Sequence, residues 1–467
     1  MKGKLRHTSL HLLTLVCVCA SLGSCSGIRN LRKPSLELPK EIVAGANDSL
    51  SYADMAWWEY YTDPTLKSLI GRALERNRDM LAAAARVEEL RQLYGVEKLN
   101  YVPVITGIVG GTRETNDYYG ESFSGDPELS VKGTISWEAD LWGGLSHAKS
   151  KAAAQYQASV EEMRGMQMTV VAEVASAYFN LVALENELNI VKMTLSTRQQ
   201  ALEKAKLRFE GGMTSETVYQ QAKVEYATTA AFVPNLEQRI QISKNALSIL
   251  LGEFPGELFN LSTAHLDENL PERVPVGLPS TLLERRPDIR ASENKLKAAT
   301  AACGVAYSNQ FPKIRLALTG GWENDEIKNL FKSPFTYILG NITGTIFDFG
   351  KNKRKYKASI AAYDQARLAY EKCVLNAFRE VNDAVIAYQK LRETAALRSD
   401  LRDAALKYVE LANIQYLAGS LNYIDVLDAQ RRYFDARVSL SNAVRDEYLA
   451  LVNLYKVLGG GWTVGSR

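Results

Sequence analysis

The most regular pattern along the chain is a seven-residue repeat of apolar positions in two long segments. The first segment, about 144–211, contains no proline, and its apolar residues recur at alternating spacings of four and three: Val170, Val174, Ala177, Leu181, Leu184, Leu188, Val191 and Leu195. The second segment, about 350–418, has the same rhythm at Val374, Phe378, Val381, Val385 and Tyr388. Such spacing is typical of coiled coils. Helices of about 60 to 70 residues would be roughly 90 to 105 Å long, far longer than most globular helices.

Each long segment ends at a glycine, and a second helical pattern follows at once. Gly212 and Gly419 interrupt the two patterns, and returning helices are predicted over about 215–251 and 422–458. Glycine commonly ends a helix in a left-handed cap, and Ser215 and Asn422 are residue types that commonly begin one. The sequence therefore predicts two coiled-coil hairpins, with their tips at the two glycines.

Two segments with the alternating pattern of β-strands precede each long helix. They cover about 102–112 and 129–141 in the first half, and about 313–322 and 335–347 in the second. In 129–141 the polar residues share one face, and the apolar residues share the other: Leu129, Val131, Ile135, Trp137, Ala139 and Leu141. The segment 335–347 alternates less cleanly.

These four strands are long enough to cross a membrane, which takes about 9 to 11 residues for a strand. Four strands cannot close a barrel, however, and an open edge in hydrocarbon leaves backbone groups without hydrogen bonds. Two interpretations follow from the pattern alone. Either the sheet is a soluble one, or several chains share one barrel.

The two halves of the chain repeat each other in the same order of elements. Gly143 and Gly212 correspond to Gly350 and Gly419, both 207 positions later. Self-similarity at a fixed offset indicates two structural repeats. We place repeat 1 at 57–251 and repeat 2 at 280–458, with an inter-repeat linker and equatorial segment at 252–279 and a C-terminal tail at 459–467.

The N-terminus reads as a lipoprotein signal peptide over 1–24, followed by a lipidated arm over 25–56. Three basic residues precede an apolar run that is too short for a membrane-spanning helix, and the run ends in Leu-Gly-Ser-Cys. This ending resembles a lipobox, in which the thiol of Cys25 accepts the lipid. The alternative is an ordinary signal peptide with a chance cysteine.

Composition narrows the possible functions. The 467 residues are 46% hydrophobic, enough for a sizeable core, and the formal charge of +3 falls to about zero without the signal peptide. No basic surface for nucleic acid is expected. Without the signal peptide, His147, His265, Cys303 and Cys373 remain beside Cys25. We therefore expect no catalytic residues, no metal site and no cofactor other than a covalent lipid on Cys25.

Several motifs resemble those of one family. They are "WWEYYTDPTLKSLIGRALERNRD" at 57–79, "DLWG" at 140–143, "LPSTLLERRPDIR" at 278–290, "FP" at 311–312, "FDFG" at 347–350 and "YLAGSLNYIDVLDAQR" at 416–431. Together they resemble the outer-membrane efflux protein (TolC) family, in particular its lipoprotein branch with the OprM-like and NodT-like factors. The resemblance covers nearly the whole chain after the signal peptide.

The resemblance implies a mostly α protein with a transmembrane β-barrel part. Three chains would form a trimer with one 12-stranded barrel in the outer membrane and an α-helical tunnel in the periplasm. The implied function is passive: a non-enzymatic, lipid-anchored exit duct for drugs or other small molecules. Its partners would be a periplasmic adaptor and an inner-membrane transporter of the resistance-nodulation-division type. Alternatives are a type I secretion exit channel, a non-conducting structural lipoprotein that spans the periplasm, and a periplasmic enzyme on a helical scaffold.

The resemblance also assigns roles to residues at the hairpin tips. A periplasmic gate is expected at Ile424, Asp425, Asp428 and Arg431, with three copies of Asp428 attracting cations and Arg431 joining neighbouring chains. The alternative is that these are ordinary solvated charges at the start of a helix. The adaptor would contact the tips of both hairpins, at Gly212, Met213, Thr214, Ser215, Gly419, Ser420 and Leu421.

Overall fold

The computed structural model describes residues 31, 34, 51–113, 115–118, 121–124, 128–256, 266, 270, 274–277, 279–344 and 347–462, without the side chains of 52, 115–118 and 121–124. The predicted signal peptide and Cys25 lie outside the described residues. The chain divides into two units. One contains 86–160 and 291–372, and the other contains 51–85, 161–290 and 373–462 among the described residues.

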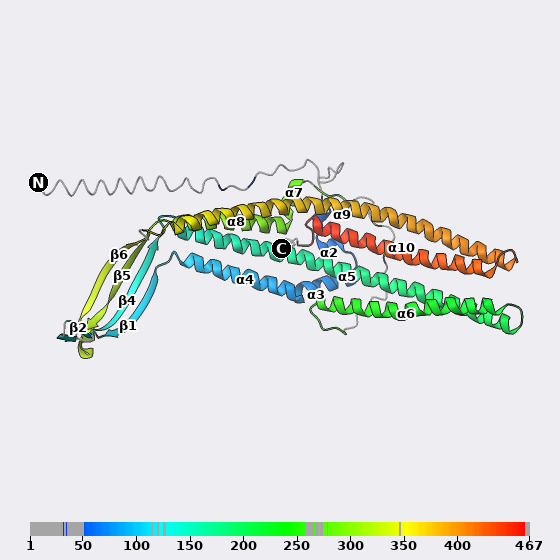
Figure 1. Cartoon of the computed structure of the whole chain (residues 1–467), viewed down its shortest axis with the longest axis horizontal. Helices are drawn as coiled ribbons and strands as arrows, with labels where there is room; N and C mark the ends of the chain where they lie inside the picture. The colour runs from blue at the N-terminus through cyan, green and yellow to red at the C-terminus, as the bar shows by residue number, and fades with distance from the viewer. Residues whose placement is uncertain are drawn as a thin grey trace. The chain divides into compact units, whose positions relative to one another are not determined.

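The first unit contains an antiparallel sheet in the order β1-β4-β5-β6 (Figure 1). Its strands are β1 (Val104–Thr112), β4 (Glu128–Ala139), β5 (Lys313–Asn324) and β6 (Pro334–Thr343). A small hairpin of β2 (Thr115–Tyr118) and β3 (Glu121–Ser124) joins β1 to β4, and a 3-10 turn, η2 (Ile327–Lys332), lies between β5 and β6. The strand predicted over 335–347 is shorter than expected. It ends at Thr343 because its partner strand begins at Lys313, opposite that residue.

One face of this sheet is apolar and exposed to an unusual degree. The strand register aligns Ile105, Ile135, Leu318 and Ile338 in one row across all four strands. These side chains are 75%, 42%, 41% and 79% exposed. In a water-soluble sheet such a row would be covered by other elements, and an uncovered apolar surface marks contact with a membrane or a partner.

The opposite face of the sheet is polar and internally hydrogen-bonded. The hydroxyls of Thr134 and Thr319 lie 2.9 Å apart on adjacent strands. The carboxylate of Glu138 accepts from Lys313 at 3.0 Å and from Arg315 at 3.1 Å. An apolar face and a polar face on one sheet are typical of a membrane barrel, whose outer face meets lipid and whose interior holds water. This arrangement favours the interpretation that several chains share one barrel over that of a soluble sheet.

An aspartate caps the start of the long helix in each repeat. The carboxylate of Asp140 accepts from the backbone N–H groups of Leu145 (2.9 Å) and Ser146 (2.8 Å), at the start of α5 (Gly144–Glu210). Asp348 accepts in the same way from Gly350 and Asn352, at the start of α9 (Lys351–Leu417). These carboxylates satisfy N–H groups that a helix start leaves unpaired.

The second unit is helical, and most of the predicted seven-residue positions are buried in it. Of the positions in α5, Val170, Val174, Leu181, Leu184 and Val191 are buried, and in α9 so are Val374, Val381, Val385 and Tyr388. The main hydrophobic core packs the α5 positions against α3 (Pro64–Arg76), α6 (Glu216–Leu250) and α10 (Tyr423–Val457). One window of α5 is apolar enough to cross a membrane, but 67% of it is buried within the protein. This is what a core helix of a coiled-coil hairpin requires.

The remaining helices are short or connect the two units. They are η1 (Tyr52–Asp54), α2 (Trp57–Tyr60), α4 (Arg78–Leu99), α7 (Pro279–Arg285) and α8 (Pro287–Ser308). Each long helix pairs with its returning helix, α5 with α6 and α9 with α10 (Figure 1). The two halves therefore repeat the same order of elements, as the sequence predicted.

Candidate functional site

The two hairpin tips have the same backbone geometry. Gly212 and Gly419 have φ angles of +67° and +77°, in the left-handed region that favours glycine. At each tip, a backbone N–H bonds back to the preceding helix, from Met213 to the carbonyl of Arg208 and from Ser420 to that of Gln415. The predicted left-handed caps are therefore present in both repeats.

The expected tip residues lie together at the two turns. Gly212, Met213, Ser215, Gly419 and Ser420 are exposed, whereas Thr214 and Leu421 are half-buried. Ser215 and Asn422 are the N-cap residues directly before α6 and α10, but neither side chain accepts a hydrogen bond from its helix. Their role as helix starters is therefore weaker than their residue types suggest.

The predicted gate residues lie on the first three turns of α10. Ile424 is 51% exposed, and the side chains of Asp428 and Arg431 are 41% and 48% exposed. Asp428 pairs with Arg432 at 2.7 Å, one turn away on the same helix. Asp425 is half-buried.

Arg431 has a partner that the sequence did not predict. Its Nε atom lies 3.3 Å from a carboxylate oxygen of Glu225 on α6. Arg431 was expected to join neighbouring chains, but within one chain it already joins the second hairpin to the first. It faces α6, whereas Arg432 lies one turn from Asp428, and the two arginines therefore have different partners.

Glu225 also binds a buried arginine of α5. The guanidinium of Arg198 lies 3.0 Å from the other carboxylate oxygen of Glu225, and it donates to the backbone carbonyl of Glu225 and to the hydroxyl of Thr229. Burial lowers the pKa of Arg198, and the charge of Glu225 opposes this shift. One carboxylate thus connects α5, α6 and α10.

Sequence reasoning missed this cluster, although a signal was present. Arg198 is three residues after Leu195, so it continues the seven-residue pattern into a position that would normally be apolar. A cation at a core position of a coiled coil requires a buried partner. That rule would have pointed to an acidic residue on the returning helix.

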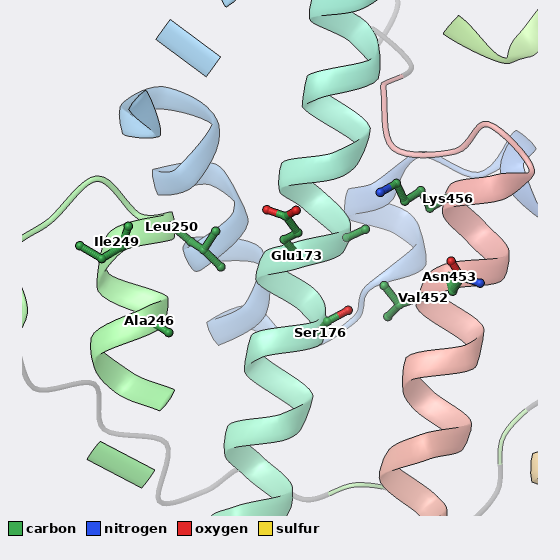
Figure 2. A pocket seen from close by; sticks show the side chains of 9 residues that line it. Glu173, Ser176, Ala246, Ile249, Leu250, Val452, Asn453 and Lys456 are labelled. Atoms are coloured by element: carbon green, nitrogen blue, oxygen red, sulfur yellow. The ribbon is translucent and has the colours of Figure 1, made fainter. Parts of the chain in front are cut away.

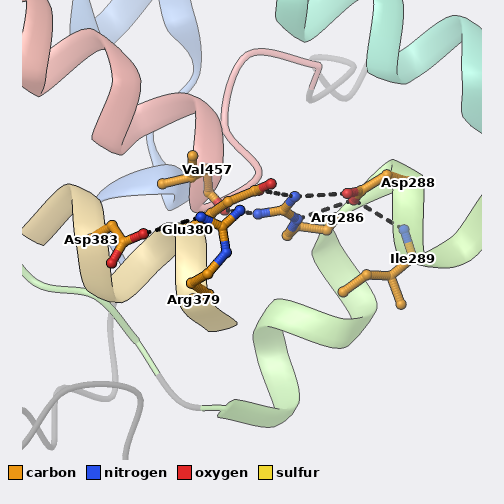
Figure 3. Close-up of polar contacts among 7 residues, drawn as sticks. All are labelled: Arg286, Asp288, Ile289, Arg379, Glu380, Asp383 and Val457. Atoms are coloured by element: carbon orange, nitrogen blue, oxygen red, sulfur yellow. Dashed lines mark hydrogen bonds and ion pairs between the residues drawn. The ribbon is translucent and has the colours of Figure 1, made fainter. Parts of the chain in front are cut away.

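The motif "LERRPDIR" forms a second polar cluster, drawn in Figure 3. Arg286 donates to Asp288 at 2.7 Å, to Glu380 of α9 at 2.7 Å and to the backbone carbonyl of Val457 at 3.0 Å. Burial disfavours the charge of Arg286, but the hydrogen bonds to Asp288 and Glu380 outweigh burial and raise its pKa. The motif therefore holds the end of α10 against α8 and α9.

An open and largely apolar cavity of about 590 Å³ lies between α5, α6 and α10 (Figure 2). Its polar side chains are Glu173, Ser176, Asn453 and Lys456. Over the described ranges of the chain, no group of three or more His, Cys, Asp and Glu residues is arranged to hold a metal ion.

Comparison with known proteins agrees with this geometry. Residues 69–253 and 278–460 each match the family model described as outer membrane efflux protein. The solvent efflux pump outer membrane protein SrpC of Pseudomonas putida is 32% identical over 459 residues, which cover 96% of this chain and 97% of SrpC.

Solved structures show the same fold. A membrane protein from Pseudomonas aeruginosa matches with a TM-score of 0.84 at 29% identity, over 91% of this chain and 99% of that one. The open state of the MtrE outer membrane channel of Neisseria gonorrhoeae matches with a TM-score of 0.79 at 30% identity, over 92% and 98% of the two chains. With one family match in each repeat and a relative aligned along nearly its whole length, the chain belongs to the outer membrane efflux protein family.

Proposed function

We propose that this protein is the outer-membrane exit duct of a tripartite efflux pump, which passively conducts drugs or other small molecules out of the cell. The observation that carries the proposal is the sheet, with its exposed apolar row on one face and its hydrogen-bonded Thr134, Thr319 and Glu138 on the other. The apolar face suits lipid and the polar face suits a water-filled passage. Membership of the efflux family and the name of SrpC support the same function.

The duct requires more than one chain, because β1 and β6 are the edges of the four-stranded sheet and a membrane sheet cannot leave its edges unpaired. We propose a trimer, as the family resemblance implies. Three chains with four strands each would close a 12-stranded barrel. Native mass spectrometry of the protein in detergent tests this assembly. A mass of three chains is expected, and a stable monomer would contradict the architecture.

The partners we propose are a periplasmic adaptor and an inner-membrane transporter of the resistance-nodulation-division type. The exposed tips of both hairpins, around Met213 and Ser420, would contact the adaptor. We propose that the protein is not an enzyme and that it needs no cofactor other than a covalent lipid on Cys25. The pump, as the source of energy, would select the cargo.

The lipid anchor is a separate proposal, which rests on the sequence before Cys25. Cys25→Ser should abolish labelling by radioactive palmitate, whereas Cys373→Ser should leave it unchanged. Full labelling of the Cys25→Ser protein would contradict the assignment.

Conduction is tested by single-channel recording from the full-length protein in planar bilayers. We expect discrete openings that favour cations, because Asp428 is partly exposed at the proposed gate. Absence of any conductance from a folded trimer would refute the duct and leave a structural lipoprotein as the alternative.

A further inference from the structure

A cavity of about 500 Å³ lies between the two hairpins, close to their tips and entirely within the helical unit. Side chains from all four helices line it: α5 and α6 of the first hairpin, and α9 and α10 of the second. Small-molecule sites commonly have volumes of about 300 to 1,000 Å³. The cavity is therefore large enough for an organic ligand that touches both hairpins at once.

The walls of this cavity are mainly apolar and aromatic. Val426 on α10 and Ala205 on α5 both line the space and are buried. The rings of Tyr416 and Tyr423 lie 5.5 Å apart, at 50° to each other, and both line the space. Such walls favour a rigid apolar body over a flexible polar one.

The charged side chains that line the cavity are both cationic. Lys204 and Arg208 are four residues apart on α5, so their charges lie on the same face and repel each other. No carboxylate lines the space, and among the described residues neither cation forms an ion pair. The Nη1 atom of Arg208 lies 3.4 Å from the hydroxyl of Tyr416, so this guanidinium reaches the second hairpin.

We propose that this cavity binds an anionic amphiphile with a rigid apolar body and one carboxylate or sulfonate group. The anion would lie between Lys204 and Arg208, relieving their repulsion, and the apolar body would pack against Tyr416, Tyr423 and Val426. Because this ligand contacts both hairpins, it stabilises the arrangement in which they are adjacent. Its consequence for transport, a channel held closed, rests on the proposed function.

The binding experiment uses the full-length protein in lipid nanodiscs with 1-pyrenebutyrate as the probe, measured by fluorescence anisotropy against empty nanodiscs. Two variants should weaken or remove specific binding for different reasons. Lys204→Gln with Arg208→Gln removes both cations, and Ala201→Trp fills the cavity while it keeps them. The matched control, Lys206→Gln with Lys223→Gln, removes two charges from the first hairpin outside the cavity.

We expect the affinity to fall about tenfold or more in the first double variant, since two charge-assisted contacts are lost. Ala201→Trp should lose saturable binding, and the control should match the parent. The uncharged methyl ester of the probe should also bind at least tenfold more weakly. Equal affinity of the acid and the ester, or unchanged binding in Ala201→Trp, would overturn the site.

The effect on the hairpins is measured separately in planar bilayers. The probe should lower the open probability of the parent channel and leave that of the Lys204→Gln, Arg208→Gln channel unchanged. Binding without any effect on opening would overturn the proposal that the ligand holds the hairpins together. The anisotropy measurement does not require conduction, so a failure of the channel function and a failure of this site are distinguishable.

Discussion

The two returning helices, α6 and α10, occupy equivalent places in the two repeats and are both 35 residues long, yet they are enclosed to different degrees. Six residues of α6 are buried within the chain, against fifteen of α10. The large apolar residues exposed on α6 are Val224, Phe232, Ile242 and Ile249, whereas on α10 only Ile424 is exposed. A duplicated sequence thus built the same element twice, but α6 keeps an apolar surface that a neighbouring chain could cover.

The ends of the same two helices show a second difference. The carbonyl of Leu250 at the end of α6 accepts from the side-chain amide of Asn77 at 2.9 Å. The equivalent carbonyl of Val457 on α10 accepts from Arg286 at 3.0 Å. Asn77 and Arg286 occupy corresponding positions of the two repeats. The charged Arg286 also forms an ion pair with Glu380 of α9, which the neutral Asn77 cannot do at the end of α6.

The largest expected effect is the loss of unfolding free energy when a buried residue of α10 is truncated, compared with an exposed residue of α6. Leu454→Ala removes a side chain that is 1% exposed, and we expect a loss of about 2 to 5 kcal/mol in the free energy of unfolding. Chemical unfolding followed by circular dichroism measures this loss. Ile242→Ala on α6, which is 60% exposed, should have a smaller effect on unfolding but lower the trimer fraction in native mass spectrometry. Equal unfolding losses for both would remove the distinction.

The next largest effect is expected when the contacts of Arg286 at the end of α10 are removed. Arg286→Ala leaves Glu380 and the carbonyl of Val457 without their donor, and we expect a loss of about 2 to 4 kcal/mol in the free energy of unfolding. Asn77→Ala removes a neutral hydrogen bond from the equivalent carbonyl and should cost about 1 kcal/mol.

The matched control for Arg286→Ala is Arg379→Ala, which removes an exposed arginine next to Glu380 (Figure 3). Its unfolding free energy should stay within about 0.5 kcal/mol of the parent. A cost for Asn77→Ala as large as that for Arg286→Ala would show that the charge adds nothing.

A smaller effect is expected at the proposed gate. Asp428→Ala with Arg431→Ala removes a partly exposed anion and the ion pair to Glu225 that joins the hairpins. A partly exposed pair is worth about 1 kcal/mol or less, so the open population should rise up to about fivefold. Planar-bilayer recordings should show higher conductance and weaker cation preference. Conductance and selectivity equal to those of the parent would place the gate elsewhere.

The smallest effects are expected at the N-cap residues directly before α6 and α10. Neither Ser215 nor Asn422 accepts a hydrogen bond from its helix, so Ser215→Ala and Asn422→Ala should each change the free energy of unfolding by less than about 0.5 kcal/mol. Ser215→Ala should also leave conductance unchanged. By contrast, the carboxylate of Asp63 accepts hydrogen bonds from the N–H groups of Thr65 and Leu66. Asp63→Ala should therefore lower the free energy of unfolding by about 1 kcal/mol or more. A similar cost at all three positions would contradict the observed capping.

Much of the fold could be read from local patterns. The seven-residue repeat identified α5 and α9, and the positive φ of Gly212 and Gly419 agrees with the predicted tips. The alternation in 129–141 separated the two faces of β4, which are the apolar and polar faces of the observed sheet. These features depend on residues within one or two helical turns or within one strand, so the local sequence is enough to predict them.

The candidate site was predicted only in outline. The family resemblance assigned Asp428 and Arg431 to one gate, but nothing in the sequence analysis identified Glu225, 206 positions earlier than Arg431, as a partner of Arg431. It also led us to expect capping by Ser215, which the structure does not contain. A residue type indicates what a side chain can bind, not whether a partner lies within reach.

The sequence by itself determined the kinds of elements, their order, their duplication and the face on which each side chain lies. Only the tertiary structure decided which faces meet: Glu225 between Arg198 and Arg431, Arg286 against Val457, and a cationic cavity between the hairpins. The physical reason is range. Helical and strand periodicity arise from backbone geometry over a few residues, whereas an ion pair, a buried arginine or a cavity depends on how distant elements pack together.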